Sequence, residues 1–475
     1  MRVCLIAEGC YPYITGGVSS WIQMLIKNFP EYEFIVIAIS AKKDEALTPK
    51  YELPQNVRKV IDIYLESDMK NQVSNNKKVK IHFNEKEKAQ IYHFLAGDKF
   101  DWATLLNCLN RYKNYTTVDF LTSQEFIEIV MKVSNERYPH ISFNHFFWTI
   151  RSMMIPFLEV IKFDIPKADI YHSVSTGYAG VLGAIGKIKH NGKFLLTEHG
   201  IYTREREEEI IKADWVKGYF KDNWIKYFYS LSDCAYSYAD QVISLFEKSR
   251  QLQLELGCDK SKTKVIPNGV DYQRFELVNN PMNKEQTDKI VLGAIVRVVP
   301  IKDIKTLIQS FSIVKSKDLD FEIELHIIGP TEEDPDYMRE CEHLIESLEL
   351  QDVLFTGKVD ISQYIHQLDI IILSSISEGQ PLSTLEAMAA KKPCICTDVG
   401  SCKELLYGNQ DQLGECGIIV PVMGHEEMAN AIINLASDSE KRRKLGEIGY
   451  QRVLKFYRQE QFITNYKILY KELVG

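Results

Sequence analysis

The stretch that decides the fold is Ser377-Glu378-Gly379-Gln380-Pro381-Leu382-Ser383-Thr384-Leu385-Glu386-Ala387-Met388-Ala389-Ala390. It follows the apolar run 368–373, which predicts a buried strand. Pro381 suits the first position of a helix, where its missing N–H costs nothing. Leu385, Met388 and Ala389 share one face of that helix. The stretch therefore predicts a strand, a loop and a helix in succession.

Two carboxylates are placed by this arrangement, Glu378 in the loop and Glu386 further into the helix. The helix N-terminus between them offers free backbone N–H groups and the positive end of a dipole. Carboxylates accept hydrogen bonds from sugar hydroxyls, and helix N-termini hold phosphates. The stretch is thus suited to a nucleotide-sugar. The alternative is a capped amphipathic helix with a solvated Glu386.

The composition restricts the class of protein. A chain of 475 residues is long enough for two or three domains, and its net charge of −8 argues against nucleic acid as a partner. None of the ten cysteines forms Cys-x-x-Cys, which favours reduced, buried thiols. We find no signal peptide and no apolar run of membrane-spanning length. We therefore expect a cytoplasmic protein that reaches the inner face of a membrane only through partners.

Short apolar runs alternate with helical patterns in both halves of the chain, as parallel strands covered on both faces do. The expected strands are 2–8, 34–39, 168–174, 193–197, 241–245 and 264–267, then 290–296, 321–328, 353–356, 368–373, 393–397 and 417–420. The fold class is α/β, with two doubly wound, Rossmann-like domains facing a cleft. We expect domains at 1–278 and 279–455, a final helix at 456–475, and a largely helical insertion at about 41–165.

Two motifs of the first half follow predicted strands. Gly16 and Gly17 lie between the first strand and a helix, where glycine lets a ligand approach the backbone closely. His199 ends the strand 193–197, where ligands of such sheets bind. The alternatives are a plain glycine turn and a structural histidine.

Two cations follow the first strand of the second half, Arg297 and Lys302. Arg binds a diphosphate in a bidentate manner and Lys adds a compact charge, so the pair suits a leaving nucleoside diphosphate. The alternative is two surface cations. Asp-x-Asp occurs at 318–320 and at 334–336, both by chance in a chain with 65 acidic residues. We predict no metal, because cations and a helix dipole already supply positive charge.

The order of these motifs along the chain resembles retaining glycosyltransferase family 4, which has the GT-B fold. The motifs are Gly16-Gly17, His199, Asn268-Gly269, Arg297, Lys302 and the Glu-x7-Glu of Glu378 and Glu386. The resemblance implies that Arg297 and Lys302 hold the donor diphosphate, that Glu386 binds the ribose and that Glu378 contacts the donor sugar. By the same resemblance, Gly17 and the backbone of Gly379, Gln380, Pro381 and Leu382 line the phosphates and the sugar.

Residues 4–21 and 197–206 also resemble the PelF family of Pel exopolysaccharide synthesis. This resemblance implies a UDP-sugar donor, UDP-N-acetylhexosamine or UDP-glucose, a polysaccharide acceptor and docking to inner-membrane synthase or export proteins. Two other functions stay open: a sugar phosphorylase or epimerase, and a non-catalytic nucleotide-sugar-binding scaffold.

Overall fold

The computed structural model describes residues 1–43, 48–66, 81–276, 289–409 and 411–475. The chain divides into two compact units. The N-terminal unit comprises 1–244, 249–265 and 468–475, and the C-terminal unit comprises 245–248 and 266–467. The domain boundary expected at 278–279 lies outside the described residues.

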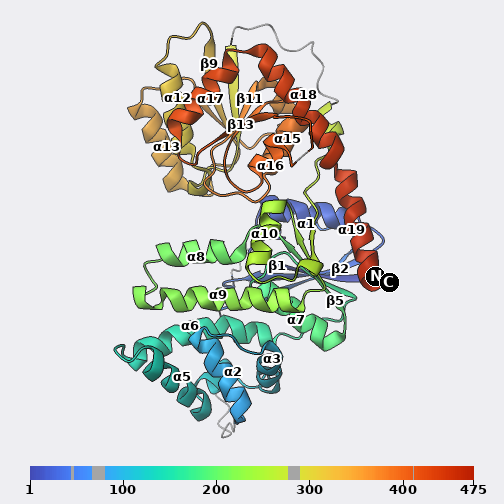
Figure 1. Cartoon of the computed structure of the whole chain (residues 1–475), viewed down its shortest axis with the longest axis vertical. Helices are drawn as coiled ribbons and strands as arrows, with labels where there is room; N and C mark the ends of the chain where they lie inside the picture. Colours follow the sequence, from blue (N-terminus) through green and yellow to red (C-terminus); the bar gives the residue numbers. More distant parts are fainter. Residues whose placement is uncertain (44–47, 67–80, 277–288, 410) are drawn as a thin grey trace. The chain divides into compact units, whose positions relative to one another are not determined.

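The N-terminal unit is built on a seven-stranded parallel sheet of order β3-β2-β1-β4-β5-β6-β7 (Figure 1). Its strands are β1 (Arg2–Glu8), β2 (Glu33–Ser40), β3 (Val57–Tyr64), β4 (Ile170–Ser173), β5 (Lys193–Glu198), β6 (Gln241–Ser244) and β7 (Thr263–Val265). The chain adds strands β2 and β3 on one side of β1, and strands β4 to β7 on the other side. The direction in which strands are added therefore reverses between β1 and β4. Ligands of doubly wound sheets bind beyond the strand ends at such a reversal.

The helices of the N-terminal unit flank this sheet or lie in the insertion. They are α1 (Gly17–Lys27), α2 (Glu85–Ala96), α3 (Trp102–Arg111), α4 (Thr117–Leu121), α5 (Gln124–Arg137), α6 (Phe143–Lys162), α7 (Tyr178–His190), α8 (Tyr202–Lys212), α9 (Gly218–Tyr238) and most of α10 (Glu247–Glu255). Helices α2 to α6 form a layer of their own beyond α7 and α9 (Figure 1). The insertion is therefore largely helical, as predicted.

One strand was not predicted. We expected 41–165 to be helical, but β3 at Val57–Tyr64 joins the edge of the sheet by pairing with β2. The strand is only partly buried, and Arg58, Lys59 and Asp62 interrupt its apolar residues. Those charges hid the strand from a search for continuous apolar runs.

The C-terminal unit repeats the same plan with a six-stranded parallel sheet of order β10-β9-β8-β11-β12-β13. Its strands are β8 (Lys289–Ile295), β9 (Glu322–Ile328), β10 (Val353–Gly357), β11 (Ile370–Leu373), β12 (Cys394–Thr397) and β13 (Gly417–Val420). Its helices are α11 (Gln273–Glu276), α12 (Ile304–Lys315), α13 (Pro335–Ser347), α14 (Ile361–Tyr364), α15 (Leu382–Ala389), α16 (Cys402–Tyr407), α17 (His425–Ala436) and α18 (Ser439–Phe456). The order reverses between β8 and β11.

The end of the chain is helical, as expected, and its last helix is close to the 456–475 that we predicted. Helix α18 ends at Phe456, and α19 (Gln459–Val474) begins three residues later. Between them the chain pairs with Val270, whose N–H donates to the Tyr457 carbonyl at 2.8 Å. The last residues, 468–475, belong to the N-terminal unit, where the Tyr470 hydroxyl lies 2.7 Å from His172 Nδ1.

Candidate functional site

Four of the predicted site residues follow β8 or β11, the two strands at which the C-terminal sheet reverses its order. Arg297 follows β8, and Lys302 ends the short 3-10 helix Pro300–Lys302 before α12. Glu378 follows β11, the strand that neighbours β8, and Glu386 lies in α15. A ligand beyond the carboxyl ends of these two strands meets both loops.

Lys302 and Glu378 are bonded to each other. The Lys302 Nζ donates to Glu378 Oε1 at 2.5 Å, and both side chains are mostly buried. Ser375 Oγ donates to the same oxygen at 2.7 Å, and Ser374 Oγ donates to the Lys302 carbonyl at 2.8 Å. The loops that follow β8 and β11 are thus tied together.

Arg297 also has a carboxylate partner, which the sequence did not indicate. Its Nη1 donates to Glu333 Oε1, and both side chains are partly exposed. The loop of Glu333 follows β9 and is fixed nearby, because the Val298 N–H donates to the Pro330 carbonyl at 3.0 Å. Both cations that we assigned to a diphosphate are therefore neutralised by carboxylates in the chain itself.

The loop from Glu378 to Pro381 is braced from two sides. The Ser401 N–H donates to the Gly379 carbonyl at 2.9 Å, and a Cβ on Gly400 would lie 2.1 Å from that oxygen. The side-chain oxygen of Gln380 accepts the Asn268 N–H at 2.6 Å. Asn268 is buried, so the Asn-Gly turn supports this loop from within the same unit. Sequence spacing could not reveal the contact.

Pro381 is the N-cap of α15 and Leu382 its first residue, one position later than we predicted. The ring of Pro381 still removes an N–H that the first turn would leave unpaired. Leu385, Met388 and Ala389 are buried, as their spacing predicted. Because α15 bears no side-chain cap, its first N–H groups stay available.

Glu386 sits in a desolvated position. Burial raises the pKa of its carboxyl to about 7, while the positive charge of Arg274 opposes that rise. Arg274 lies on α11 and also donates to Asp360 at 2.7 Å. A carboxyl group that ionises near neutral pH accepts hydroxyl donors best when it is deprotonated.

Gly16 and Gly17 lie at the N-terminus of α1 in the N-terminal unit. Gly16 is the N-cap of α1 with an extended backbone, and a Cβ at either glycine would meet no atom within 4 Å. Neither the backbone conformation nor the packing within the described chain demands glycine at these positions. Close approach of a ligand is an explanation that remains.

His199 directly follows β5, and its ring lies edge-on to Trp21 of α1 with 4.7 Å between the ring centroids. Its Nε2 is buried and has no hydrogen-bond partner among the described residues. Burial lowers the pKa of the imidazole to about 3, so the ring is neutral at physiological pH. It can exchange one hydrogen bond with a sugar hydroxyl but supplies no positive charge.

A buried network that we did not predict holds the loop after His199. The Tyr202 N–H donates to Glu198 Oε1 at 3.3 Å, and its hydroxyl donates to Glu8 Oε1 at 3.4 Å. Glu198 also accepts from Tyr236 at 2.8 Å and from Gln253 at 3.0 Å. Burial raises the pKa of Glu198 to about 7. The signal in the sequence is that Glu8 and Glu198 each end an apolar strand.

Neither Asp-x-Asp pair forms a metal site. Asp334 caps α13 by accepting the Tyr337 N–H at 3.0 Å, and Asp336 pairs with Arg339. Among the described residues, no group of three or more His, Cys, Asp or Glu side chains could hold a metal ion. A metal-independent reaction stays a prediction.

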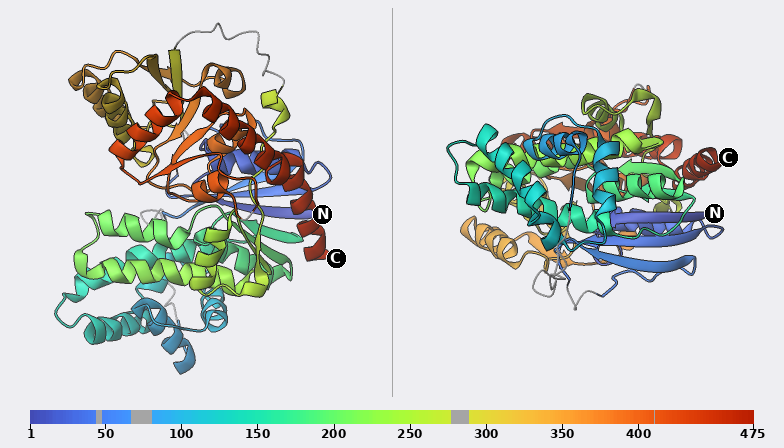
Figure 2. Two further views of the ribbon diagram at one scale, coloured as in Figure 1. Left: turned by 45° about the horizontal axis from the view of Figure 1, so that its top comes forward. Right: turned by 90° about the horizontal axis from the view of Figure 1, so that it is seen from below.

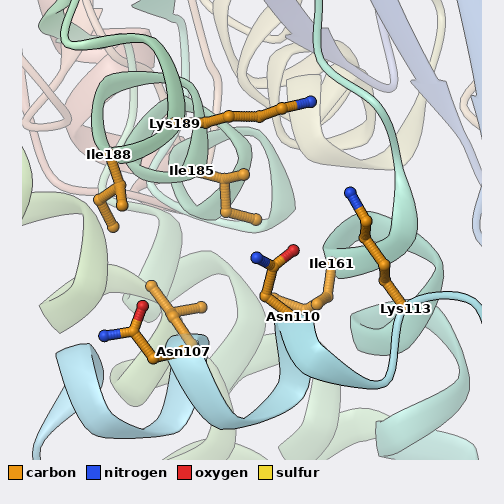
Figure 3. A pocket seen from close by; sticks show the side chains of 8 residues that line it. Asn107, Asn110, Lys113, Ile161, Ile185, Ile188 and Lys189 are labelled. Atoms are coloured by element: carbon orange, nitrogen blue, oxygen red, sulfur yellow. The ribbon is translucent and has the colours of Figure 1, made fainter.

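A separate pocket of about 120 Å³ lies among α3, α6 and α7 of the N-terminal unit (Figure 3). Its lining includes Asn107, Asn110, Lys113, Lys189 and the isoleucines 161, 185 and 188. None of these is a predicted site residue, and Lys189 is paired with Asp164. The pocket therefore adds nothing to the candidate site.

Two family models cover most of the chain. Residues 1–261 match a domain of unknown function, DUF3492, and residues 279–452 match glycosyl transferases group 1. The capsular polysaccharide biosynthesis glycosyltransferase CapM of Staphylococcus aureus is 27% identical over 280 residues, which is 56% of this chain and 70% of that protein. The putative glycosyltransferase EpsD of Bacillus subtilis is 27% identical over 309 residues, 63% of this chain and 74% of that protein.

Solved structures share the fold over nearly the whole chain. HepE of Anabaena, solved in complex with UDP-glucose, matches with a TM-score of 0.62 and 15% identity over 99% of this chain and 100% of that one. Sucrose-phosphate synthase of Thermosynechococcus elongatus matches with a TM-score of 0.62 and 16% identity over 99% and 98%. The predicted GT-B fold is confirmed. The DUF3492 model covers more than half of the residues of this chain, so the chain belongs to the DUF3492 family. A glycosyl transferases group 1 domain follows at residues 279–452.

Proposed function

We propose that the chain is a retaining glycosyltransferase, of family 4 type, that transfers a sugar from a UDP-sugar to a growing exopolysaccharide such as Pel. The observation that carries the proposal is the convergence of Arg297, Lys302 and Glu378 at the reversal point of the C-terminal sheet, beside the uncapped start of α15. Glycosyltransferase relatives support a transferase that uses nucleotide sugars. The UDP and UDP-glucose complexes of HepE support the choice of donor.

In the proposed reaction, Arg297 and Lys302 bind the diphosphate and stabilise the charge that grows on it as the bond to the sugar breaks. Glu386 accepts hydrogen bonds from the ribose, Glu378 from the donor sugar, and neutral His199 contacts a sugar hydroxyl. The acceptor hydroxyl forms the new bond on the face that the diphosphate leaves, and its proton passes to the departing phosphate oxygen. No carboxylate acts as a nucleophile in this scheme.

The acceptor is a polysaccharide, and inner-membrane synthase or export proteins are the proposed partners. CapM, which is named for capsular polysaccharide biosynthesis, supports this class of acceptor. Within the described residues, none of the helices combines the length and the apolar character that a membrane crossing needs.

Titration calorimetry with UDP, GDP and ADP tests the donor site. We expect selective UDP binding that is lost in Arg297→Ala. The control is Lys315→Ala, which should keep UDP binding, because Lys315 is a cation at the far end of α12 that pairs with Asp352. Turnover of a UDP-sugar with retention of the anomeric configuration completes the assignment. Binding of another nucleotide would remove the UDP-sugar assignment. Absence of all binding would leave a phosphorylase or a partner-dependent scaffold. Epimer formation without an acceptor would leave a nucleotide-sugar epimerase, and UDP binding without turnover would leave a scaffold.

A further inference from the structure

The loop at 378–381, which we call the donor loop, is joined to a turn that lies 112 residues earlier in the chain. The two residues that meet, Asn268 and Gln380, are both buried and exchange hydrogen bonds. The Asn268 backbone N–H donates to Gln380 Oε1 at 2.6 Å, and Asn268 Nδ2 donates to the Gln380 carbonyl at 3.4 Å. The position of the donor loop therefore depends on the turn at 268–270, which we call the linking turn.

The linking turn is held on its other side by the connection between α18 and α19, the two successive red helices of Figures 1 and 2. The Val270 N–H donates to the Tyr457 carbonyl at 2.8 Å, and the Gln459 N–H donates to the Val270 carbonyl at 3.0 Å. Gly269 fits tightly, since a Cβ there would lie 2.7 Å from Gln459 Cα and 2.8 Å from the Arg458 carbonyl oxygen. The linking turn and this connection therefore move only together.

Both segments lie near places where the chain passes from one compact unit to the other. The stretch 249–265 belongs to the N-terminal unit, and the C-terminal unit resumes at Ile266, shortly before the linking turn. Helix α19 begins in the C-terminal unit, and from Ile468 its residues belong to the N-terminal unit. The contacts that hold the donor loop thus lead to two of the passages between the units.

Two buried polar atoms at this junction, Asn268 Oδ1 and Arg458 Nε, have no hydrogen-bond partner among the described residues. A buried polar atom without a partner lowers the free energy of unfolding. The stability of the turn alone therefore does not explain Asn268, whose amide nitrogen reaches the donor loop while its amide oxygen stays unpaired. Local costs of this kind are typical of functional positions.

We propose that Asn268 and Gln380 are positioning residues of the donor site, and that the linking turn couples the donor loop to the connection between α18 and α19. The path is a contiguous set of hydrogen bonds, from Gln459 to Val270 and from Asn268 to Gln380. Because coupling is reciprocal, donor binding should order the connection, and loosening the connection should weaken donor binding. The role of the loop in donor binding rests on the function proposed above, whereas the coupling itself does not.

Gln459→Pro cuts the path at a single hydrogen bond. Gln459 is the first residue of α19, a position where proline is tolerated because its N–H bonds to no carbonyl of the helix. The substitution removes the N–H that donates to the Val270 carbonyl. The matched control is Ser439→Pro, which places proline at the first residue of α18 in the same unit, outside the path.

Hydrogen exchange of the free full chain, followed by mass spectrometry, measures the coupling without any ligand. In Gln459→Pro we expect the amides of 378–380 to exchange about threefold to tenfold faster than in the wild type, the range that the loss of one hydrogen bond allows. Calorimetry should show an affinity for UDP that is lowered by a similar factor. Ser439→Pro should leave both quantities at their wild-type values.

Gln380→Met locates the path, because it keeps the length of the side chain and removes the oxygen that accepts the Asn268 N–H. In the Gln380→Met background, Gln459→Pro should change the exchange of the donor loop and the affinity for UDP no further. Gln380→Glu keeps an acceptor oxygen and should keep the response to Gln459→Pro.

Wild-type exchange of the donor loop in Gln459→Pro would overturn the coupling. Faster exchange throughout the C-terminal unit would also overturn it, because it would mark a general loosening. Additive effects of Gln380→Met and Gln459→Pro would overturn the path through Asn268. Faster exchange confined to the donor loop, in a chain that binds no UDP, would support the coupling and remove the proposed donor function.

Discussion

Lys302 and Glu378 form a 2.5 Å ion pair between the loops that follow β8 and β11, the strands at which the C-terminal sheet reverses its order. Ser375 donates to the same carboxylate oxygen. A phosphate that binds Lys302 must share the lysine with Glu378 or replace it. The carboxylate therefore holds the cation in place and also competes with the proposed donor for it.

Glu378→Gln separates these two roles, because the amide keeps the shape and removes the charge. We expect UDP affinity to be kept or raised, while turnover falls about tenfold to a hundredfold through loss of the contact to the donor sugar. Glu386→Ala should show the reverse, with UDP affinity lowered about tenfold or more. Calorimetry and initial rates measure the two effects. Equal UDP affinity in the wild type and Glu386→Ala would exclude the ribose role.

Glu333 forms an ion pair with the guanidinium of Arg297 and should therefore lower the affinity for the nucleotide. Glu333→Gln removes the competing charge, so we expect UDP to bind about two- to fivefold more tightly, the range that a partly exposed ion pair allows. Glu340→Gln is the matched control, since Glu340 pairs with Lys305 between α12 and α13. An unchanged affinity in Glu333→Gln would show that the pair does not compete with the ligand.

Nucleotide binding should depend on the ionisation of Glu386, whose pKa burial raises to about 7. The ionised form accepts ribose hydroxyls better, so affinity should rise with pH. We expect the ratio of wild-type to Glu386→Gln affinity for UDP to increase about tenfold between about pH 6 and pH 8. The ratio cancels the titration of UDP itself. A ratio that does not vary with pH would contradict the prediction.

Gly400 should be intolerant of a side chain. Its φ is +50°, and a Cβ would lie 2.1 Å from the Gly379 carbonyl and 2.3 Å from that of Glu378. Gly400→Ala must displace this loop, so we expect a loss of about 2 kcal/mol or more in unfolding free energy and a large loss of turnover. Gly357→Ala is the control: its φ is +67° but no atom lies within 4 Å of its Cβ. Gly357→Ala should lower the unfolding free energy by about 1 kcal/mol and leave turnover intact.

Glu198 should make stability depend on pH. Its pKa is about 7 in the folded chain against 4.5 for the free group, because burial disfavours its charge. The folded state then binds more protons than the unfolded state between these values, so stability falls as pH rises through that window. Relative to the wild type, Glu198→Gln should gain roughly 3 kcal/mol of unfolding free energy between about pH 5 and pH 8. Urea unfolding at both pH values measures it, and a constant difference would contradict it.

All twelve predicted runs contain all or part of a strand, and most of these strands are buried, because a continuous apolar run is stable in the interior of a covered sheet. The strand β3 was missed because charged residues interrupt its apolar run. The glycines 180, 183 and 186 lie in α7, where a Cβ at each would clash with Ala235, Phe194 or Tyr171.

The sequence by itself determined the α/β class, the doubling of the fold and the positions of the site motifs, since each motif directly follows an apolar run. The tertiary structure alone decided which side chains neutralise one another. The pairings of Lys302 with Glu378, Arg297 with Glu333 and Tyr202 with Glu8 join residues far apart in the chain. Spacing along a sequence carries no information about such contacts, because the order of strands in the sheet brings them together.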